Sequence, residues 1–180
     1  MHPDVKEIML SELEIKSKIK DLGDKISCDY EKCESITVVG ILKGAMIFMS
    51  DLVRVISVPV FFDFMAVSSY GSSTESSGAV RILKDLDKNV EGKHVLIVED
   101  IVDTGLTLNY LINNLHNRNV ASLKICTLLD KPSRRKVDVR IDYNGFEIPD
   151  EFVVGYGLDF NEHYRNLPYI AVLKPEVYKR

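Results

Sequence analysis

The sequence has little of what disulfide-bonded or metal-caged proteins need. Its three cysteines, Cys28, Cys33 and Cys126, form no CxxC pair and leave an odd count. A disulfide framework is therefore not expected, and a reducing cytoplasm is the compartment that fits this cysteine usage. The four histidines lie far apart without the spacing of metal ligands, so we interpret them as surface or packed residues.

An excess of positive charge and long apolar runs are also lacking. The formal net charge is −4 at pH 7, which gives no support for non-specific binding of nucleic acid. No apolar run is long enough to cross a bilayer. Residues 1–20 mix charged with apolar side chains and contain no signal-peptide core. We therefore expect neither a nucleic acid nor a membrane among the partners of the protein.

The chain does have enough apolar residues to bury one core. It has 180 residues, of which 46% are hydrophobic and 28% charged, the mix of an ordinary globular domain. We expect a single domain over residues 1–180. Its core should span about residues 34–130, with a smaller hood formed by the N-terminal residues and about residues 131–180.

Predicted strands alternate with predicted helices, which is typical of an α/β fold with a mostly parallel sheet flanked by helices. The first helix opens on the capping box of Ser11 and Glu14 and ends near Gly23 or resumes through residues 28–33. Its apolar face is formed by Leu13, Ile15, Ile19 and Leu22. Further helices are expected at 45–56 and 106–119, loops at 68–78 and 131–136, and strands at 36–42, 58–67, 80–83, 94–98, 123–129, 152–156 and 169–173.

The most informative segment follows the predicted strand at 94–98. That strand stops at the two carboxylates of Glu99 and Asp100, and residues 103–107, Asp-Thr-Gly-Leu-Thr, then open a helix. Such a loop suits a phosphate, because Gly105 allows close approach and the helix N-terminus supplies N–H groups and positive potential. The acidic pair suits ribose hydroxyls or a divalent cation. Together these features indicate nucleotide chemistry.

Two other polar positions directly follow predicted strands. These are Lys43-Gly44 and Lys131. Ligands of parallel α/β sheets bind at the carboxyl ends of the strands, so we expect both positions to meet the acidic pair and its loop in one crevice.

Residues 98–107, VEDIVDTGLT, resemble the phosphoribosyl-pyrophosphate motif of the type I phosphoribosyltransferases. From about the first predicted strand to Lys174, the chain is similar to the bacterial hypoxanthine-guanine branch of that family. The matching segments are VGILKGA at 39–45, SSYGSST at 68–74, LLDKP at 128–132 and GFEIPDEFVVGYGLDF at 145–160. Some relatives carry Lys in place of Leu106, so no ionic contact is assigned to that position.

The resemblance implies a type I phosphoribosyltransferase fold and an enzyme of purine salvage. Such an enzyme transfers the 5-phosphoribosyl group from phosphoribosyl pyrophosphate to hypoxanthine or guanine. The products are IMP or GMP and pyrophosphate, and Mg²⁺ is the cofactor. The resemblance also implies a homo-oligomer, either a dimer or a tetramer. The alternatives are a xanthine-preferring transferase, or a regulator that binds phosphoribosyl pyrophosphate and nucleic acid without turnover.

For the phosphoribosyl group, the resemblance implies a binding loop formed by Asp103, Thr104, Gly105, Leu106 and Thr107. Asp103 would accept the proton from N7 of the purine as general base. The alternative for Asp103 is a helix N-cap, and one residue could do both. Ribose hydroxyls and Mg²⁺ would be held by a further pair, Glu99 and Asp100. The alternative for that pair is a solvated strand end.

For the pyrophosphate, the resemblance implies Lys43 and Gly44 in a loop that begins with a cis peptide bond. Asp159 would ligate a second Mg²⁺, and Arg165 would bind pyrophosphate oxygens through its planar guanidinium. Without the resemblance, Lys43-Gly44 is an ordinary turn, and Arg165 is a surface residue paired with Glu162.

For the purine, the resemblance implies that Lys131 donates to the 6-oxo group. An exocyclic amine offers an ammonium group no acceptor, so Lys131 should select hypoxanthine and guanine over adenine. Phe152 would stack on the purine, while Val153 and Asp159 would read its 2-position edge. By pattern alone, Phe152 and Val153 are strand core, and Lys131 belongs to a basic surface run. We interpret the rest of that run as surface residues, namely Arg134, Arg135 and Lys136.

The loop at 68–78 contains Ser69 and Tyr70, which the family uses in a lid. Closure of such a lid would protect an oxocarbenium-like centre from water. The alternative is a surface loop without a role.

Overall fold

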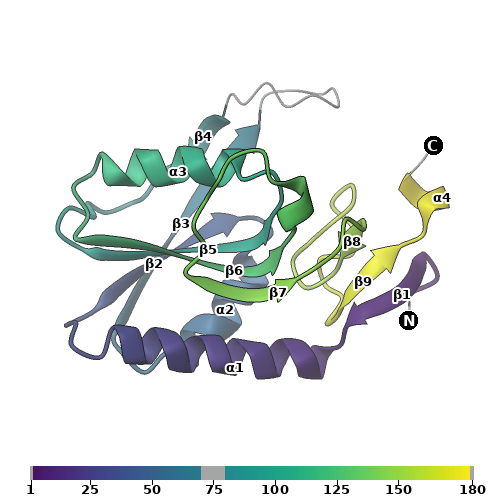
Figure 1. The fold of residues 1–180 in the computed structure, drawn as a ribbon, viewed down its shortest axis with the longest axis horizontal. Coiled ribbons are helices and arrows are strands. Elements are labelled where there is room, and N and C mark those ends of the chain that lie inside the picture. The colour runs from purple at the N-terminus through teal and green to yellow at the C-terminus, as the bar shows by residue number, and fades with distance from the viewer. Residues whose placement is uncertain (1, 70–79, 179–180) are drawn as a thin grey trace.

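The computed structural model describes residues 2–69 and 80–178, which form two β-sheets and the helices packed on them (Figure 1). The larger sheet has six strands in the order β4-β3-β2-β5-β6-β7, and the smaller has three in the order β1-β9-β8. The elements are β1 (Val5–Leu10), α1 (Glu12–Asp29), β2 (Ile36–Leu42), α2 (Met46–Val53), β3 (Val60–Ser69), β4 (Val80–Lys84), β5 (His94–Val102), α3 (Leu106–His116), β6 (Ser122–Asp130), η1 (Pro132–Arg134), β7 (Tyr143–Glu147), β8 (Val153–Val154), β9 (Ile170–Leu173) and α4 (Pro175–Tyr178).

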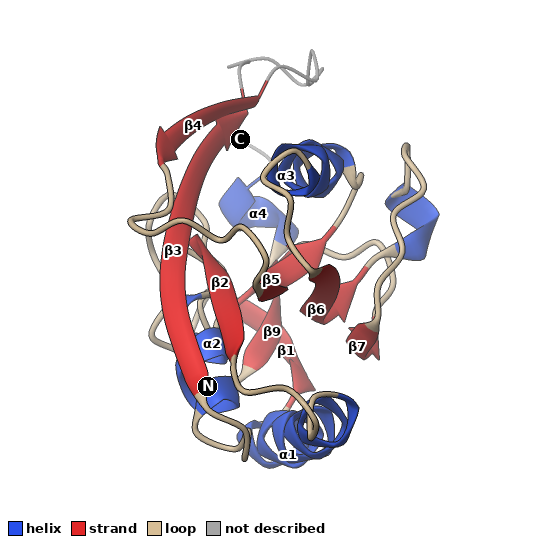
Figure 2. Ribbon diagram, turned by 90° about the vertical axis from the view of Figure 1, so that its left-hand side faces the viewer, coloured by secondary structure: helices blue, strands red, loops and turns tan. Residues whose placement is uncertain are grey.

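The larger sheet is parallel except for its edge strand β4, which runs antiparallel to β3. Helices α1 and α2 cover one face and α3 covers the other, as Figure 2 shows. Strand β2 is buried on both sides, because Val38 packs towards α1 and α2 while Val39 packs towards α3. Burial on both faces explains why residues 36–42 form a continuous apolar run. The predicted mostly parallel α/β fold is confirmed.

Helix α1 has the predicted N-terminus but not the predicted end. The Ser11 side chain accepts from the backbone N–H of Glu14, and the Glu14 carboxylate accepts from Ser11, so the capping box is present. The helix continues past Gly23, where a Cβ atom would lie 2.6 Å from a methyl group of Val55. Gly23 is therefore a close-packing position rather than a helix stop. Leu13, expected on the apolar face, is 79% exposed, and Ile26 completes the buried face instead.

Two strands were not predicted, and one predicted strand is shorter. β1 pairs antiparallel with β9, and β7 pairs parallel with β6 at the edge of the larger sheet. The strand expected at 152–156 is reduced to the two residues of β8. Strand β5, in contrast, continues through the acidic pair to Val102.

The three-stranded sheet is built from the two ends of the described chain. Strand β9 lies between β1 and β8, so the first and last strands along the sequence are neighbours (Figure 1). The Tyr156 hydroxyl, just after β8, donates to the carboxylate of Asp51 in α2 and joins this sheet to the larger layer. None of the helices in residues 2–69 and 80–178 is both long and apolar enough to span a membrane.

Candidate active site

The acidic pair lies inside β5 rather than beyond its end. Glu99 is only 8% exposed, so the interpretation as a solvated strand end is wrong. Burial, and for Glu99 also the charge of Asp100, raises the pKa of both carboxyl groups. The backbone N–H of Ile101 donates to Oδ1 of Asp100 over 2.8 Å, which partly offsets this effect at Asp100.

Two adjacent carboxylates, one buried and one half-buried, are a donor set that fits Mg²⁺. This ion binds through one or two protein carboxylates and takes its other ligands from water and substrate oxygens. A divalent cation would also favour the charged form of both carboxyl groups, against the burial that raises their pKa and against the charge of Asp100 that raises the pKa of Glu99 further. The described residues contain no group of three or more His, Cys, Asp or Glu side chains placed to hold a metal.

The acidic pair and the loop after it line a hollow of about 230 Å³. Its lining consists of residues 99–105, 107 and 108. Gly105 adopts a left-handed conformation with φ 81° and is the N-cap of α3. The alternative interpretation of Asp103 as the helix N-cap is therefore wrong. Leu106, which begins α3, donates its N–H to the hydroxyl oxygen of Thr104 over 3.4 Å. Except for Leu106, every residue expected in the phosphoribosyl site lines this hollow.

The basic segment after β6 contacts this loop. Arg134 and Lys136 are exposed, as their interpretation as surface residues expects, whereas Arg135 is partly buried. Arg134 donates from Nε to Oδ1 of Asp103 over 3.1 Å. Arg135 donates from Nη1 to the backbone oxygen of Asp103 over 2.7 Å and pairs with the carboxylate of Asp130. The backbone N–H of Lys136 donates to the Thr104 oxygen over 2.9 Å. The turn η1 brings the chain back to the loop after β5. The periodicity of apolar residues in the sequence does not predict this change of direction.

The loop after β2 approaches the acidic pair very closely. The Leu42–Lys43 peptide bond is cis, as the resemblance implies. A Cβ atom at Gly44 would lie 1.6 Å from Oδ2 of Asp100, and one at Gly157 would lie 2.1 Å from the backbone oxygen of Gly44. Both glycines therefore allow three segments to meet. Gly157 was not singled out from the sequence, although the Gly-x-Gly at 155–157 was a signal for such an approach.

The loop at 155–165 brings two basic and two acidic side chains together. Arg165 donates from Nη1 to the Gly157 oxygen over 2.7 Å, and its Nη2 lies 2.8 Å from Oδ1 of Asp159. The same Nη2 lies 3.3 Å from Oε1 of Glu162, so the expected alternative ion pair of Arg165 is present. Lys43 donates to Oε2 of Glu162 over 2.8 Å. The residues expected at the pyrophosphate are thus brought together, with Glu162 among them.

The residues expected to bind the purine come from the segment after β6 and from the stretch that begins at Glu151. Lys131 is only 8% exposed and donates from Nζ to the Glu151 oxygen over 2.7 Å, so it is not a surface residue. Phe152 is 37% exposed, stacks on Tyr178 at 4.7 Å between ring centroids, and meets Phe160 edge-on at 5.6 Å. Tyr178 was not predictable from the sequence, because its position depends on the path of α4.

Two further expected residues differ in how they are placed. Val153 is buried in β8 opposite Val172 of β9, so the interpretation as strand core holds for it and not for Phe152. Ser69 is the last residue of β3. Tyr70 lies outside the described residues, so the lid stays a prediction.

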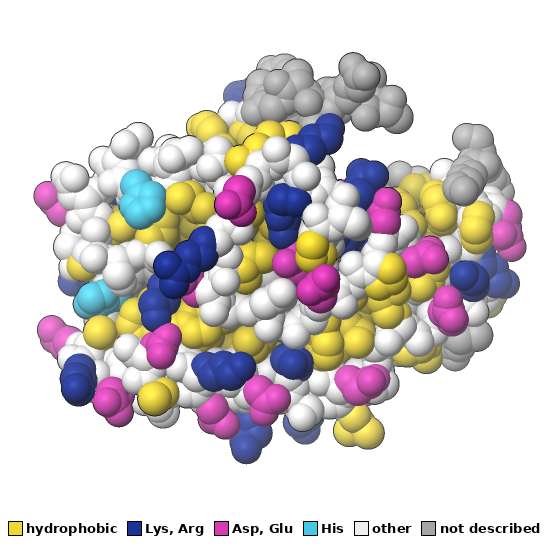
Figure 3. Space-filling view, viewed as in Figure 1, with side chains coloured by type: hydrophobic (Ala, Val, Ile, Leu, Met, Phe, Trp, Pro, Cys, Tyr) yellow, Lys and Arg dark blue, Asp and Glu magenta, His cyan; other side chains and the backbone are white. Residues whose placement is uncertain are grey.

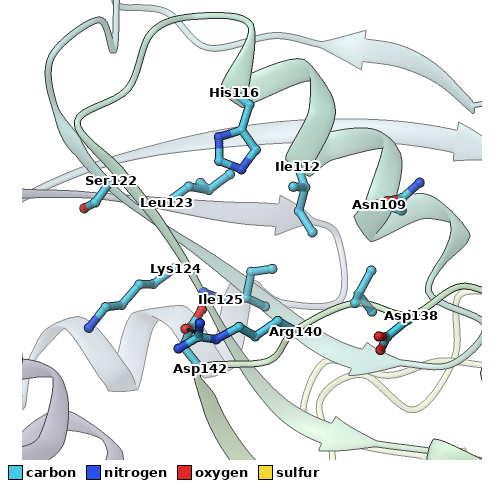
Figure 4. A pocket seen from close by; sticks show the side chains of 11 residues that line it. Asn109, Ile112, His116, Ser122, Leu123, Lys124, Ile125, Asp138, Arg140 and Asp142 are labelled. Atoms are coloured by element: carbon cyan, nitrogen blue, oxygen red, sulfur yellow. Dashed lines mark hydrogen bonds and ion pairs between the residues drawn. The ribbon is translucent and has the colours of Figure 1, made fainter.

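A second hollow, of about 420 Å³, lies between α3, β6 and the segment before β7. Figure 4 shows the side chains of Ile112 and His116 pointing from α3 towards Leu123 and Ile125, with Asn109 farther along the helix. None of the predicted site residues lines it. On the face drawn in Figure 3, acidic and basic side chains are interspersed among apolar ones.

The fold and this arrangement of loops match a known family. Residues 6–161 match the family model of the phosphoribosyl transferase domain. The chain therefore belongs to the phosphoribosyltransferase family. It is 54% identical over 179 residues to a hypoxanthine-guanine phosphoribosyltransferase of Bacillus subtilis, covering 99% of both chains. It is 53% identical over 181 residues to the enzyme of that name from Mycobacterium tuberculosis H37Rv, covering 98% of this chain and 90% of that protein.

Solved structures are similar over the same length. The structure of a hypoxanthine phosphoribosyltransferase from Staphylococcus aureus superposes with a TM-score of 0.96 at 54% identity, covering 100% of this chain and 97% of that one. The hypoxanthine phosphoribosyl transferase of Trypanosoma cruzi superposes with a TM-score of 0.95 at 44% identity, covering 99% and 96%. The predicted resemblance and fold are confirmed.

Proposed function

We propose that the protein is a purine salvage enzyme that transfers the 5-phosphoribosyl group from phosphoribosyl pyrophosphate to hypoxanthine and guanine, forming IMP or GMP and pyrophosphate. The observation that carries this proposal is the meeting of four segments around one site. These are the loops after β2, β5 and β6 and the stretch from Glu151 to Arg165. Full-length similarity to enzymes of this name supports the same activity.

The loop after β5 holds the 5′-phosphate. Gly105 leaves room for the anion, and the first N–H groups of α3 together with the Thr104 and Thr107 hydroxyls donate to it. Position 106 is Leu, so its side chain adds no charge, and binding depends on these neutral donors. The neighbouring Glu99 and Asp100 hold the ribose hydroxyls and the metal.

Glu99 and Asp100 would hold Mg²⁺, and Asp159 would ligate a second Mg²⁺; a metal bound there would help to neutralise the leaving pyrophosphate. The protein adds two cations of its own. Arg165 presents a planar fork of donors, and Lys43 stands at the start of the loop whose backbone faces Asp100 through Gly44. The closeness of this loop to the acidic pair supports a single site for ribose and pyrophosphate.

Asp103 accepts the proton from N7 while a purine ring nitrogen bonds to the anomeric carbon and pyrophosphate leaves. Its carboxylate is free from helix capping, and the contact with Arg134 holds it at the hollow. Lys131 selects the 6-oxo group, because its buried ammonium only donates: besides the Glu151 oxygen it can donate to a 6-oxo group, whereas an exocyclic amine offers it no acceptor. Phe152 supplies the stacking surface, and backbone groups of Val153 together with Asp159 face the 2-position edge.

The test is to offer hypoxanthine, guanine, xanthine and adenine separately with phosphoribosyl pyrophosphate and Mg²⁺. Nucleotide should form from the first two and not from adenine, and a chelator should stop the reaction until Mg²⁺ is restored. Absence of product from both hypoxanthine and guanine would overturn the proposal. A clear preference for xanthine, or tight salt-sensitive nucleic-acid binding without turnover, would favour the alternatives instead. The similarity to hypoxanthine-guanine enzymes does not favour either alternative.

We also propose that the enzyme works in the cytoplasm as a homo-dimer or homo-tetramer. Its substrates are small molecules, and its three cysteines suit a reducing compartment. Light scattering coupled to size-exclusion chromatography would report the mass in solution. A mass of one 20.4 kDa chain at working concentration would overturn the oligomer.

A further inference from the structure

Glu162 occupies a backbone position that normally takes glycine. Phe160 and His163 form an isolated antiparallel bridge, with both reciprocal N–H to oxygen bonds at 3.2 and 3.0 Å. The two residues between them, Asn161 and Glu162, have φ of 51° and 66°. This is a two-residue turn with both central residues left-handed, for which Asn-Gly is the preferred sequence. Asn suits the first position, whereas Glu at the second carries a conformational cost that Gly would avoid.

The side chain of Glu162 offers a reason for that cost. Its Oε2 accepts from Lys43 Nζ over 2.8 Å, and its Oε1 lies 3.3 Å from Nη2 of Arg165. One carboxylate therefore bridges the two cations that are proposed to bind pyrophosphate. The contact to Lys43 is also the first cause that lowers the pKa of the Glu162 carboxyl group.

The bridge is accessible to an incoming anion. The Glu162 and Lys43 side chains are 64% and 68% exposed. Ion pairs at such exposure are weak, because water screens them and two long side chains must be ordered. A pyrophosphate carries several negative charges and offers more acceptor oxygens than a carboxylate, so it can engage both cations and replace the carboxylate. The free energy of pyrophosphate binding is then reduced by the free energy of the contacts that Glu162 loses with Lys43 and Arg165.

We propose that the Glu162 carboxylate is an internal competitor for pyrophosphate. In the free enzyme it holds Lys43 and Arg165 in place, and it leaves them when a pyrophosphate group binds. Glu162 thereby lowers affinity for the pyrophosphate group and speeds release of the product. This inference rests on the proposed function, because it takes Lys43 and Arg165 as pyrophosphate-binding residues.

The test compares Glu162→Gln and Glu162→Gly with the wild-type enzyme. Gln keeps the length of the side chain and removes its charge, while Gly also suits the left-handed backbone. Pyrophosphate affinity is measured by calorimetry in the presence of Mg²⁺, and KM for phosphoribosyl pyrophosphate and for hypoxanthine by steady-state kinetics. Both variants should bind pyrophosphate roughly three- to fivefold more tightly, the scale of an exposed ion pair. KM for phosphoribosyl pyrophosphate should fall, while KM for hypoxanthine stays unchanged.

The matched control is Glu31→Gln. It makes the same change in net charge on an exposed residue between α1 and β2. That residue lies near the amino end of β2, whereas the site lies at the carboxyl ends of the strands. Equal tightening in this control would reduce the effect to general charge and overturn the inference. Unchanged or weaker binding in Glu162→Gln would also overturn it, as would tightening confined to Glu162→Gly, which would assign the effect to the backbone.

Failure of the proposed function gives a different result. In that case the wild-type enzyme would neither bind pyrophosphate nor form nucleotide from hypoxanthine. If wild type does both and the Glu162 variants leave pyrophosphate affinity unchanged, only the competitor role fails. The unfolding midpoint of Glu162→Gly should equal or exceed that of wild type, because glycine removes the left-handed cost. A lower midpoint would contradict the described turn and with it the inference.

Discussion

Arg134 donates from Nε to Oδ1 of Asp103 over 3.1 Å and so joins the segment after β6 to the loop after β5. Both side chains are about half exposed, and Arg134 also lies 3.7 Å from Oδ2 of Asp150. The contact therefore orients the proposed base without burying it.

Asp103→Asn should lower kcat by about 100-fold to 10,000-fold, the range for loss of a general base. The dissociation constant of phosphoribosyl pyrophosphate should change little, because asparagine has the same shape and the phosphate donors remain. Thermal stability should also be preserved, since Gly105 rather than Asp103 caps α3. Steady-state kinetics, calorimetry and thermal unfolding measure the three quantities. Equal losses in kcat and in substrate binding would assign Asp103 to binding instead.

Gly44→Ala should damage activity far more than stability. The new Cβ would lie 1.6 Å from Oδ2 of Asp100, and the side-chain carboxylate can rotate away more easily than the backbone can move. Displacement of Asp100 by about 1 Å could cost on the order of 100-fold in kcat/KM. The control is Gly92→Ala, at φ 67° with open space around the added methyl. It should cost about 1 kcal/mol of unfolding free energy and leave kcat/KM unchanged. Equal kinetics in the two variants would contradict the close approach.

Lys131→Met should weaken the preference for 6-oxopurines. The variant removes a buried donor and leaves the 6-oxo group unpaired, a loss of about 1–3 kcal/mol. The ratio of kcat/KM for hypoxanthine to that for adenine should therefore fall by about 5-fold to 150-fold. Lys136→Met is the matched control, since Lys136 is exposed and contributes its backbone N–H to Thr104. A ratio that falls equally in both variants would remove Lys131 from base selection.

Asp29→Asn should reduce stability at neutral pH and not in acid. Lys124 donates to Oδ2 of Asp29 over 2.6 Å, as does the Tyr143 hydroxyl over 2.6 Å, and these bonds lower the pKa of Asp29. A lowered native pKa stabilises the fold above the unfolded value of about 3.9, and this contribution disappears as pH falls through the native pKa. With the Asp29 side chain 46% exposed, the contribution should not exceed about 1 kcal/mol.

Chemical unfolding of wild type and Asp29→Asn from pH 7 to pH 2.5 measures this contribution. The difference between the two should shrink towards the acid end. Asp24→Asn is the control. Among the described residues, Asp24 forms one ion pair, with the exposed Lys20, whose Nζ lies 3.9 Å from Oδ2 of Asp24. A difference that is constant with pH would show that Asp29 acts through packing rather than charge.

Strands buried on both faces were predictable, and strands that depend on distant partners were not. Residues 36–42 form β2 with the predicted bounds, because a continuous apolar run has few other solutions. Residues 5–10 carry Lys6 and Glu7 in their middle and become a strand only by pairing with β9. Strand β7 contains Gly145, whose Cβ would lie 2.4 Å from the Leu128 oxygen, so close packing against β6 selects a residue that disfavours strands.

The residues of the site also fall into a group that was predictable from the sequence and a group that was not. Lys43, Glu99 and Lys131 were predictable neighbours, because each follows or ends a strand of one parallel sheet. Arg134 and Glu162 were not predicted as part of the site, since each reaches it from an irregular segment whose path is set by tertiary packing. Positive φ at Glu162 also has no signature in the sequence, which shows glutamate where the turn prefers glycine.

The position of β9 between β1 and β8 has a consequence for the order in which the molecule can be assembled. Synthesis proceeds from the N-terminus, so β1 emerges first and then waits for Ile170–Leu173 before it gains its partner. By that time every strand of the larger sheet, with its phosphate loop, has already been synthesised. A nascent chain can therefore fold the phosphate loop first, while the stacking surface at Phe152 is completed only by the last strand.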